Sequence, residues 1–252
     1  MVGNYKKEKH GLYVLGKENI ENESENILRQ FCPDCLVEPK EIDVEKLIED
    51  MGLNLCYTKM SENSEILGAF VFNKGVIPTY TDNHFENKVY SEKTIIIDST
   101  IAENDDPRLR FTYGHELGHY VTQYDIFHIN ENQLSLFNFN EEHDNAVICK
   151  RESIGFGSLF KGRKSLETKE DWQEWQANYF SSTLLIPKST LKIALKSYLD
   201  TYDVMDQTSL LNKLDVDEIM ELVDKLSKIY NVSNEMMINR LKSLNYLASW
   251  WV

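Results

Sequence analysis

The spacing of apolar positions in the first hundred residues changes from helical to extended. Residues 41–51 carry apolar side chains at intervals of three and four, which predicts an amphipathic helix. Extended spacing then predicts strands over residues 53–57, 66–72, 76–80 and 94–98, the last of them β-branched and buried. The second and third strands are predicted to form a hairpin around Asn73-Lys74-Gly75, because Gly75 can adopt a positive φ.

Helical spacing dominates the rest of the chain. A helix is predicted over about residues 107–124, with Asp106 as its N-cap and Pro107 at its first position. A second helix is predicted to begin at Asp171 as N-cap and to end before Pro187. Three more are predicted over residues 191–198, 217–229 and 234–244.

The pentapeptide His115-Glu116-Leu117-Gly118-His119 lies within the first of these long helices. Residues four apart project about 40° from each other around a helix, so His115 and His119 can hold one metal ion. Glu116 lies about 100° further round, within reach of a water molecule at that metal. Zinc hydrolysis needs these groups, because the metal lowers the pKa of water and a carboxylate takes its proton. The alternative interpretation is that both histidines are simply solvated on a surface helix. The helix start predicted at Asp106 and Pro107 gives the motif the context that a metal site requires and makes this alternative less favourable.

A catalytic zinc site also needs a third protein ligand and an open position for water. Glu174 on the second predicted helix is a candidate, and Asn178 lies four residues later on the same face. Asn178 could then orient a histidine ring or the carboxylate. From spacing alone, Glu174 is explained equally well as a solvated first-turn glutamate that complements the helix dipole.

Three motifs together resemble the ImmA/IrrE family of zinc metallopeptidases. They are His115-Glu116-Leu117-Gly118-His119-Tyr120, Glu174-Trp175-Gln176-Ala177-Asn178-Tyr179-Phe180 and Leu184-Leu185-Ile186-Pro187. The resemblance extends with varying strength over about residues 40–245. It implies a zincin-like catalytic core of the gluzincin type, in which His115, His119 and Glu174 bind Zn²⁺. It also implies that Glu116 is the general base and that Asn178 supports the ligands.

Other histidines and several tyrosines are weaker candidates for the site. His128 is not expected to be a ligand, because residues 120–124 lack the glycine turn of zincins that use a third histidine. One residue could stabilise the oxyanion of the reaction, and the sequence leaves four candidates open: Tyr113, Tyr120, Tyr179 and His143.

Composition limits where the protein works and what it binds. The 27 Lys and Arg residues against 41 Asp and Glu give a net charge of −14, which disfavours direct binding of nucleic acid and favours a basic partner. No apolar run approaches the roughly 20 residues of a membrane span, and the N-terminus lacks an apolar signal core. Cys32 and Cys35 form a lone CxxC among four cysteines, which we interpret as free thiols in a reducing cytoplasm.

We therefore expect an α+β fold with three parts: an N-terminal extension (1–38), a zincin-like metallopeptidase core (39–188) and a C-terminal helical subdomain (189–252). The core is expected to contain a small N-terminal β-sheet and the two motif helices. Residues 122–171 are expected to form an insertion, either a lid or a surface excursion. Residues 229–241 superficially resemble a helix-turn-helix, but a helical cap or substrate-docking element is favoured.

The predicted function is that of a zinc-dependent endopeptidase with Glu116 as general base. From the resemblance, its substrate would be a DNA-binding transcriptional repressor of the helix-turn-helix class, cleaved to release genes of a mobile element or a stress response. The alternative is a non-catalytic binding protein that retains the zinc site and sequesters a regulator. The sequence does not predict the oligomeric state, the activating signal or the cleavage site.

Overall fold

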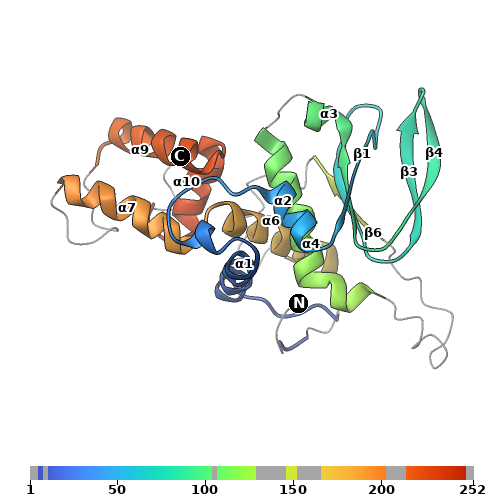
Figure 1. The fold of residues 1–252 in the computed structure, drawn as a ribbon, viewed down its shortest axis with the longest axis horizontal. Coiled ribbons are helices and arrows are strands. Elements are labelled where there is room, and N and C mark those ends of the chain that lie inside the picture. The colour runs from blue at the N-terminus through green and yellow to red at the C-terminus, as the bar shows by residue number, and fades with distance from the viewer. Residues whose placement is uncertain are drawn as a thin grey trace.

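The computed structural model describes residues 5–7, 11–103, 107–128, 146–151, 166–202 and 214–247. They form an α+β structure in which a mixed sheet stands between a group of helices and a separate hairpin (Figure 1). The strands are β1 (Asn54–Thr58), β2 (Ile66–Val71), β3 (Gly75–Thr81), β4 (His84–Tyr90), β5 (Thr94–Asp98) and β6 (Ala146–Lys150). The helices are α1 (Lys17–Phe31), α2 (Val44–Asp50), α3 (Ser99–Glu103), α4 (Pro107–Phe127), α6 (Lys169–Leu185), α7 (Lys188–Tyr202), α9 (Val216–Tyr230) and α10 (Asn234–Ser243), with a 3-10 turn at η1 (Pro33–Leu36). None of these helices combines the length and apolar character needed to cross a membrane.

The four-stranded sheet has the order β1-β5-β2-β6. β1 and β5 are parallel, and β2 is antiparallel to both β5 and β6. Alternate residues of β2 enter different cores, because successive side chains of a strand point to opposite faces. Phe70 joins the main core with α4, whereas Ala69 and Val71 join a smaller core with Ile77 of the hairpin. Both faces of the sheet are therefore covered.

The predicted hairpin between residues 66–72 and 76–80 is wrong. β2 pairs with β5 and β6, and β3 instead pairs with β4. Asp82 and Asn83 both adopt positive φ, at 49° and 64°, as a two-residue turn between twisted strands requires. β2 is a continuous apolar run buried on both faces, which is typical of a central strand whose partners come from distant segments. β4 escaped prediction because its residues are mostly polar or exposed.

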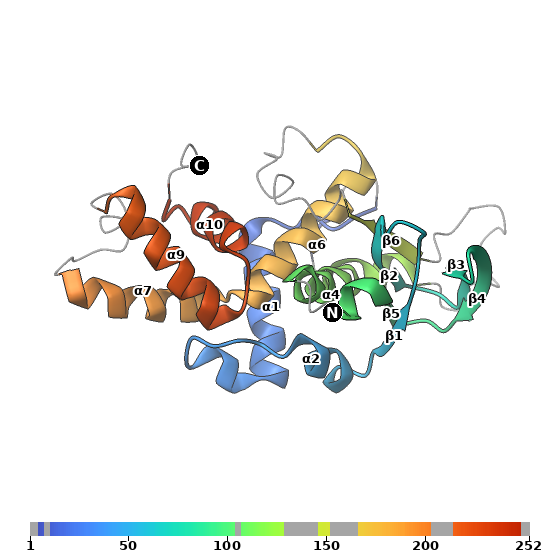
Figure 2. The same ribbon diagram turned by 90° about the horizontal axis from the view of Figure 1, so that it is seen from above.

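Helices α4 and α6 lie side by side at the centre of the molecule (Figure 2). Gly118 of α4 faces Ala177 of α6, and a Cβ atom added to Gly118 would lie 2.9 Å from the Ala177 Cα. One turn earlier, Gly114 faces Ser181 in the same way. These glycines let the two backbones approach closely, which positions the residues of the two motifs opposite each other.

The ends of the motif helices refine the predictions. α4 begins at Pro107 as predicted and extends to Phe127, while Asp106 lies outside the described residues. α6 begins earlier than predicted, because Thr168 is its N-cap and Asp171 is the third helical residue. The Asp171 amide donates to the Thr168 hydroxyl (3.0 Å) and the Asp171 carboxylate accepts from the Thr168 amide (3.1 Å). The sequence analysis assigned Asp171 as the N-cap, whereas Asp171 is the second partner of a capping box whose N-cap is Thr168.

The terminal segments pack against α6. The segment predicted as an N-terminal extension contributes α1, whose Glu21 lies beside α6 and receives hydrogen bonds from Arg240 (2.5 and 2.7 Å) and Tyr179 (2.9 Å). Arg240 is fully buried and also donates to the Ile186 carbonyl at the end of α6. The three predicted C-terminal helices are confirmed as α7, α9 and α10, which lie at the end of the molecule away from the hairpin (Figure 1).

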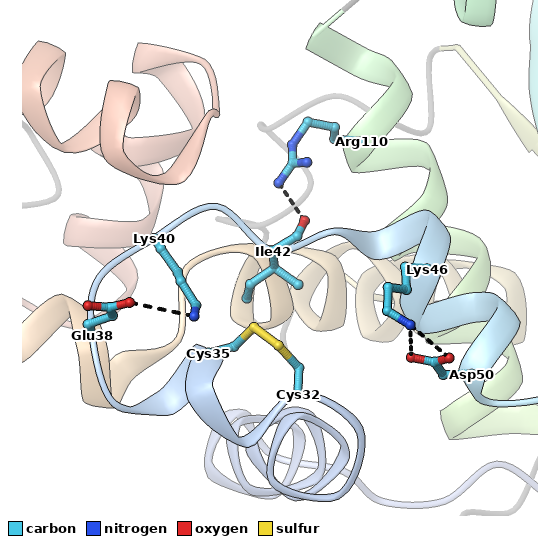
Figure 3. The surroundings of a disulfide bond; sticks show 8 residues. All are labelled: Cys32, Cys35, Glu38, Lys40, Ile42, Lys46, Asp50 and Arg110. Carbon is cyan, nitrogen blue, oxygen red and sulfur yellow. Dashed lines mark hydrogen bonds and ion pairs between the residues drawn. A yellow bond between two sulfur atoms is a disulfide. The ribbon is translucent and has the colours of Figure 1, made fainter.

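The prediction of free thiols in the CxxC is wrong, because Cys32 and Cys35 form a disulfide. The chain turns from α1 into η1 at this point and brings the two Cα atoms within 5.4 Å, a separation that a disulfide can span. Figure 3 shows Ile42 next to the bond, with the Arg110 guanidinium donating to the Ile42 carbonyl (2.9 Å). Cys56 and Cys149 are free.

Candidate metal centre

Three predicted ligands converge between α4 and α6. The Nε2 atoms of His115 and His119 lie 3.0 Å apart, and both rings are fully buried. Each of these nitrogens is 3.5 Å from a carboxylate oxygen of Glu174, whose side chain is 21% exposed. The ligand atoms of the three residues lie within 4.8 Å of one another, close enough to share one metal ion. Glu174 therefore faces the two histidines, although part of its side chain remains exposed to solvent.

Two amide side chains set the protonation of the histidine rings. His115 Nδ1 lies 2.9 Å from the Asn178 Oδ1, and His119 Nδ1 lies 2.9 Å from the Gln123 Oε1. Because an amide oxygen only accepts, each Nδ1 must donate, which leaves both Nε2 atoms unprotonated in the neutral rings. The Gln123 amide is itself oriented, since its Nε2 donates to the Gln173 carbonyl (3.0 Å).

This arrangement suits a cation. Two unprotonated nitrogens that face each other at 3.0 Å repel unless a positive charge lies between them. Burial, offset in part by Glu174, lowers the pKa of His115 to about 4, so the ring stays neutral near pH 7. Two neutral imidazoles and one carboxylate are a donor set found in catalytic zinc sites. The residues present therefore fit a zinc ion.

Glu116 lies beside the three ligands as the sequence predicted. Its side chain is fully buried, and among the described residues no nitrogen or oxygen donor hydrogen-bonds to its carboxylate, whose hydrogen-bonding neighbour is the Cys149 thiol. Burial and the charge of Glu174 raise the pKa of Glu116 well above its usual value, while the nearby Cys149 thiol opposes this shift. Gly68 of β2 makes room for the carboxylate, because a Cβ atom there would lie 2.7 Å from Glu116 Oε1.

Sequence reasoning missed three residues of this centre. Gln123 follows His119 by four residues, the same spacing by which Asn178 follows Glu174, so helical periodicity could have identified it. Gly68 carries no local signal, because its role depends on the packing of β2 against α4. Cys149 lies on β6, within the segment 122–171 that was predicted to be a lid or surface excursion. That prediction is wrong for residues 146–150, which form an edge strand; residues 129–145 and 152–165 lie outside the described structure.

The tyrosines considered for the oxyanion already have partners or packing roles. The Tyr113 hydroxyl lies 2.6 Å from the Tyr57 hydroxyl, and Tyr179 donates to Glu21 (2.9 Å). Tyr120 packs its ring against Phe70 and is partly buried. Within the described residues, Tyr120 is thus the candidate of the three whose hydroxyl makes no hydrogen bond to another helix or strand.

Outside the motif, the histidines that the structure describes do not join the centre. His128 lies at the end of α4, where its Nδ1 is 3.3 Å from the Glu92 carboxylate and its ring stacks on Tyr124. Among the described residues, His128 belongs to neither group of side chains that could hold a metal ion. His143 lies outside the described residues.

Comparisons with other proteins add no family assignment. No protein-family model matches this chain, and a search of curated proteins finds no match. The resemblance to the ImmA/IrrE family consequently depends on the motif residues themselves.

Proposed function

We propose that this protein is a zinc-dependent endopeptidase with a zincin-like core of the gluzincin type, related to the ImmA/IrrE family. The observation that carries the proposal is the convergence of three ligand groups. The Nε2 atoms of His115 and His119 lie 3.0 Å apart, and each lies 3.5 Å from a carboxylate oxygen of Glu174. His115, His119 and Glu174 would hold the metal. Asn178 and Gln123 would fix the tautomer and the orientation of the two rings.

The position of Glu116 suits a general base. When bound, a zinc ion would polarise a water molecule and the carbonyl group of the scissile peptide. Glu116 would accept a proton from the attacking water and pass it to the leaving amine. Among the described residues, the Cys149 thiol is the hydrogen-bonding neighbour of this carboxylate, and no nitrogen or oxygen donor binds it. A positive charge beside Glu116 would favour the carboxylate form that a base requires.

The edge of the sheet offers a place for an extended substrate. Among the described residues, β6 pairs only with β2, and no described strand pairs with its other edge. Cys149 of β6 faces Glu116, which places this edge next to the candidate metal centre. A peptide that added to β6 would run past the catalytic residues.

The resemblance supports a DNA-binding repressor of the helix-turn-helix class as substrate. The net charge of −14 favours association with such a basic partner and disfavours direct binding of nucleic acid. A substrate of this kind would place the peptidase in the cytoplasm.

The direct test is to incubate the purified protein with the DNA-binding regulator encoded beside its gene. We expect one stoichiometric zinc, cleavage at a defined bond, and loss of cleavage on chelation or in Glu116→Gln. The matched control is Glu170→Gln, which alters an exposed glutamate in the first turn of α6 and should cleave normally. Cleavage that persists in Glu116→Gln or without metal contradicts the proposed mechanism. Tight binding of the regulator without cleavage would instead support sequestration.

A further inference from the structure

Cys149 is a buried thiol beside the candidate metal centre that the proposed reaction does not use. It lies on β6 opposite Gly68 of β2, and its side chain is fully buried. The ligand atoms of Cys149, His115 and Glu116 all lie within 4.8 Å of one another. Both carboxylate oxygens of Glu116 are buried, and among the described residues their hydrogen-bonding neighbour is the Cys149 thiol itself. This buried cluster thus contains a thiol, an imidazole and a carboxylate, which can bind one metal ion together.

This second set overlaps with the first through His115. The Nδ1 of His115 is held by Asn178 at 2.9 Å, so only its Nε2 is available to a metal. One nitrogen lone pair binds one ion at a time. An ion bound by His115, Glu116 and Cys149 would therefore exclude an ion bound by His115, His119 and Glu174, and the two sets are alternatives.

We propose that His115, Glu116 and Cys149 form an alternative binding site for a thiophilic divalent cation, of which Cd²⁺ and Zn²⁺ are examples. Thiolate sulfur favours such ions over Mg²⁺ or Ca²⁺. The cysteine releases its proton to solvent when it binds, which gives the set two negative charges against the two positive charges of the ion. The first set supplies one negative charge, from Glu174. A thiophilic ion gains more from the thiolate sulfur of Cys149 than a harder ion does, so such an ion favours the second set.

The consequence for catalysis depends on the proposed peptidase function. Glu116 cannot accept a proton from water while its carboxylate binds the metal. Occupation of the alternative site would thus inactivate the enzyme while leaving the ion bound, and Cys149 would decide how sensitive the protein is to excess or thiophilic metal.

The test separates the two sets by disabling the first one. His119→Ala and, independently, Glu174→Gln each remove a ligand of the first set and leave the alternative set intact. We expect metal-free protein of either variant to bind Co²⁺ or Cd²⁺ with a thiolate-to-metal charge-transfer absorption band. Adding Cys149→Ser should abolish the band and weaken binding by more than the roughly 10- to 100-fold that loss of an outer hydrogen-bonding partner costs.

The matched control is Cys56→Ser, which alters the other free cysteine, half-buried on β1 and in neither ligand group. It should leave the band unchanged. Circular dichroism establishes that each variant is folded, and either first-set variant suffices for the test. A band that is absent from the folded first-set variants, or that survives Cys149→Ser, overturns the alternative site. Neither result bears on cleavage by the wild-type protein, so the proposed function is judged separately.

Discussion

The Nε2 atoms of His115 and His119 lie 3.0 Å apart, and each lies 3.5 Å from a carboxylate oxygen of Glu174. Two different helices maintain this relationship, because Asn178 of α6 orients the first ring and Gln123 of α4 orients the second. α6 thus supplies both a ligand, Glu174, and the support for a ligand on α4. The site depends on how closely these two helices pack.

Gln123→Ala should weaken zinc binding. Without the Gln123 oxygen, His119 no longer has an acceptor for its Nδ1 proton, and the ring can rotate or change tautomer. We expect a loss of about 10- to 100-fold in zinc affinity, measured by competition with a chromophoric chelator. Gln30→Ala, at an exposed position of α1, is the control and should bind zinc normally. Equal affinities for the two variants would show that Gln123 does not support the site.

Gly68→Ala should impair Glu116 without removing the metal. The new methyl group would lie 2.7 Å from Glu116 Oε1 and 3.1 Å from the Ile96 carbonyl, and the backbone oxygen cannot move aside easily. The carboxylate is then displaced, and a displacement of about 1 Å can reduce catalysis about 100-fold. Measurement of kcat/KM together with zinc content checks this. Normal activity at full zinc occupancy would contradict the close contact.

Much of this centre is predictable from sequence because its geometry is local. Four-residue spacing on a helix determines which face His115 and His119 share, and Pro107 at the first helical position predicts where α4 begins. The pairing of Glu174 with these histidines is not local. It depends on the approach of α6 to α4. The family resemblance implied that Glu174 joins the two histidines, whereas the spacing of residues along α6 did not.

The parts that escaped prediction depend on contacts between distant segments. Cys149 reaches the centre because β6 pairs with β2, where Cys149 lies opposite Gly68, 81 residues earlier in the chain. No periodicity in the sequence predicts such a pairing. α1 was missed because its buried face includes Glu21 and Ser24, which look solvent-exposed in sequence. Glu21 is buried because Arg240 neutralises it, across 219 residues.

Glu21→Gln should destabilise the fold in a pH-dependent way. Burial alone would raise the pKa of Glu21, but Arg240 and the hydrogen bond from Tyr179 outweigh it and lower the pKa. Removing the charge leaves Arg240 buried without its counter-ion, which typically costs about 3–5 kcal/mol in the free energy of unfolding. Because the pKa of Glu21 is lowered in the folded state, its contribution is present above the unfolded value of 4.5 and is lost as pH falls below it.

Denaturant unfolding of both proteins at several pH values measures this contribution. The wild type should exceed Glu21→Gln in stability at pH 7, and the difference should shrink as the pH falls below 4.5. Glu18→Gln, at an exposed position of the same helix, should change stability by less than about 0.5 kcal/mol. A difference between wild type and Glu21→Gln that stays constant with pH would exclude the ion pair as its source.

Gly118→Ala should destabilise the protein although alanine favours helices. At an exposed helix position this substitution stabilises by about 1 kcal/mol. In α4 the added Cβ would lie 2.9 Å from the Ala177 Cα and 3.0 Å from the Ala177 carbonyl oxygen, so α6 has to move away. We expect a loss of about 1–3 kcal/mol in the free energy of unfolding, as for other overpacked contacts. Because Glu174 lies on α6, the same movement should lower zinc affinity, which links the two measurements. A variant more stable than the wild type, with unchanged zinc affinity, would show that the helices do not approach as closely as the structure has them.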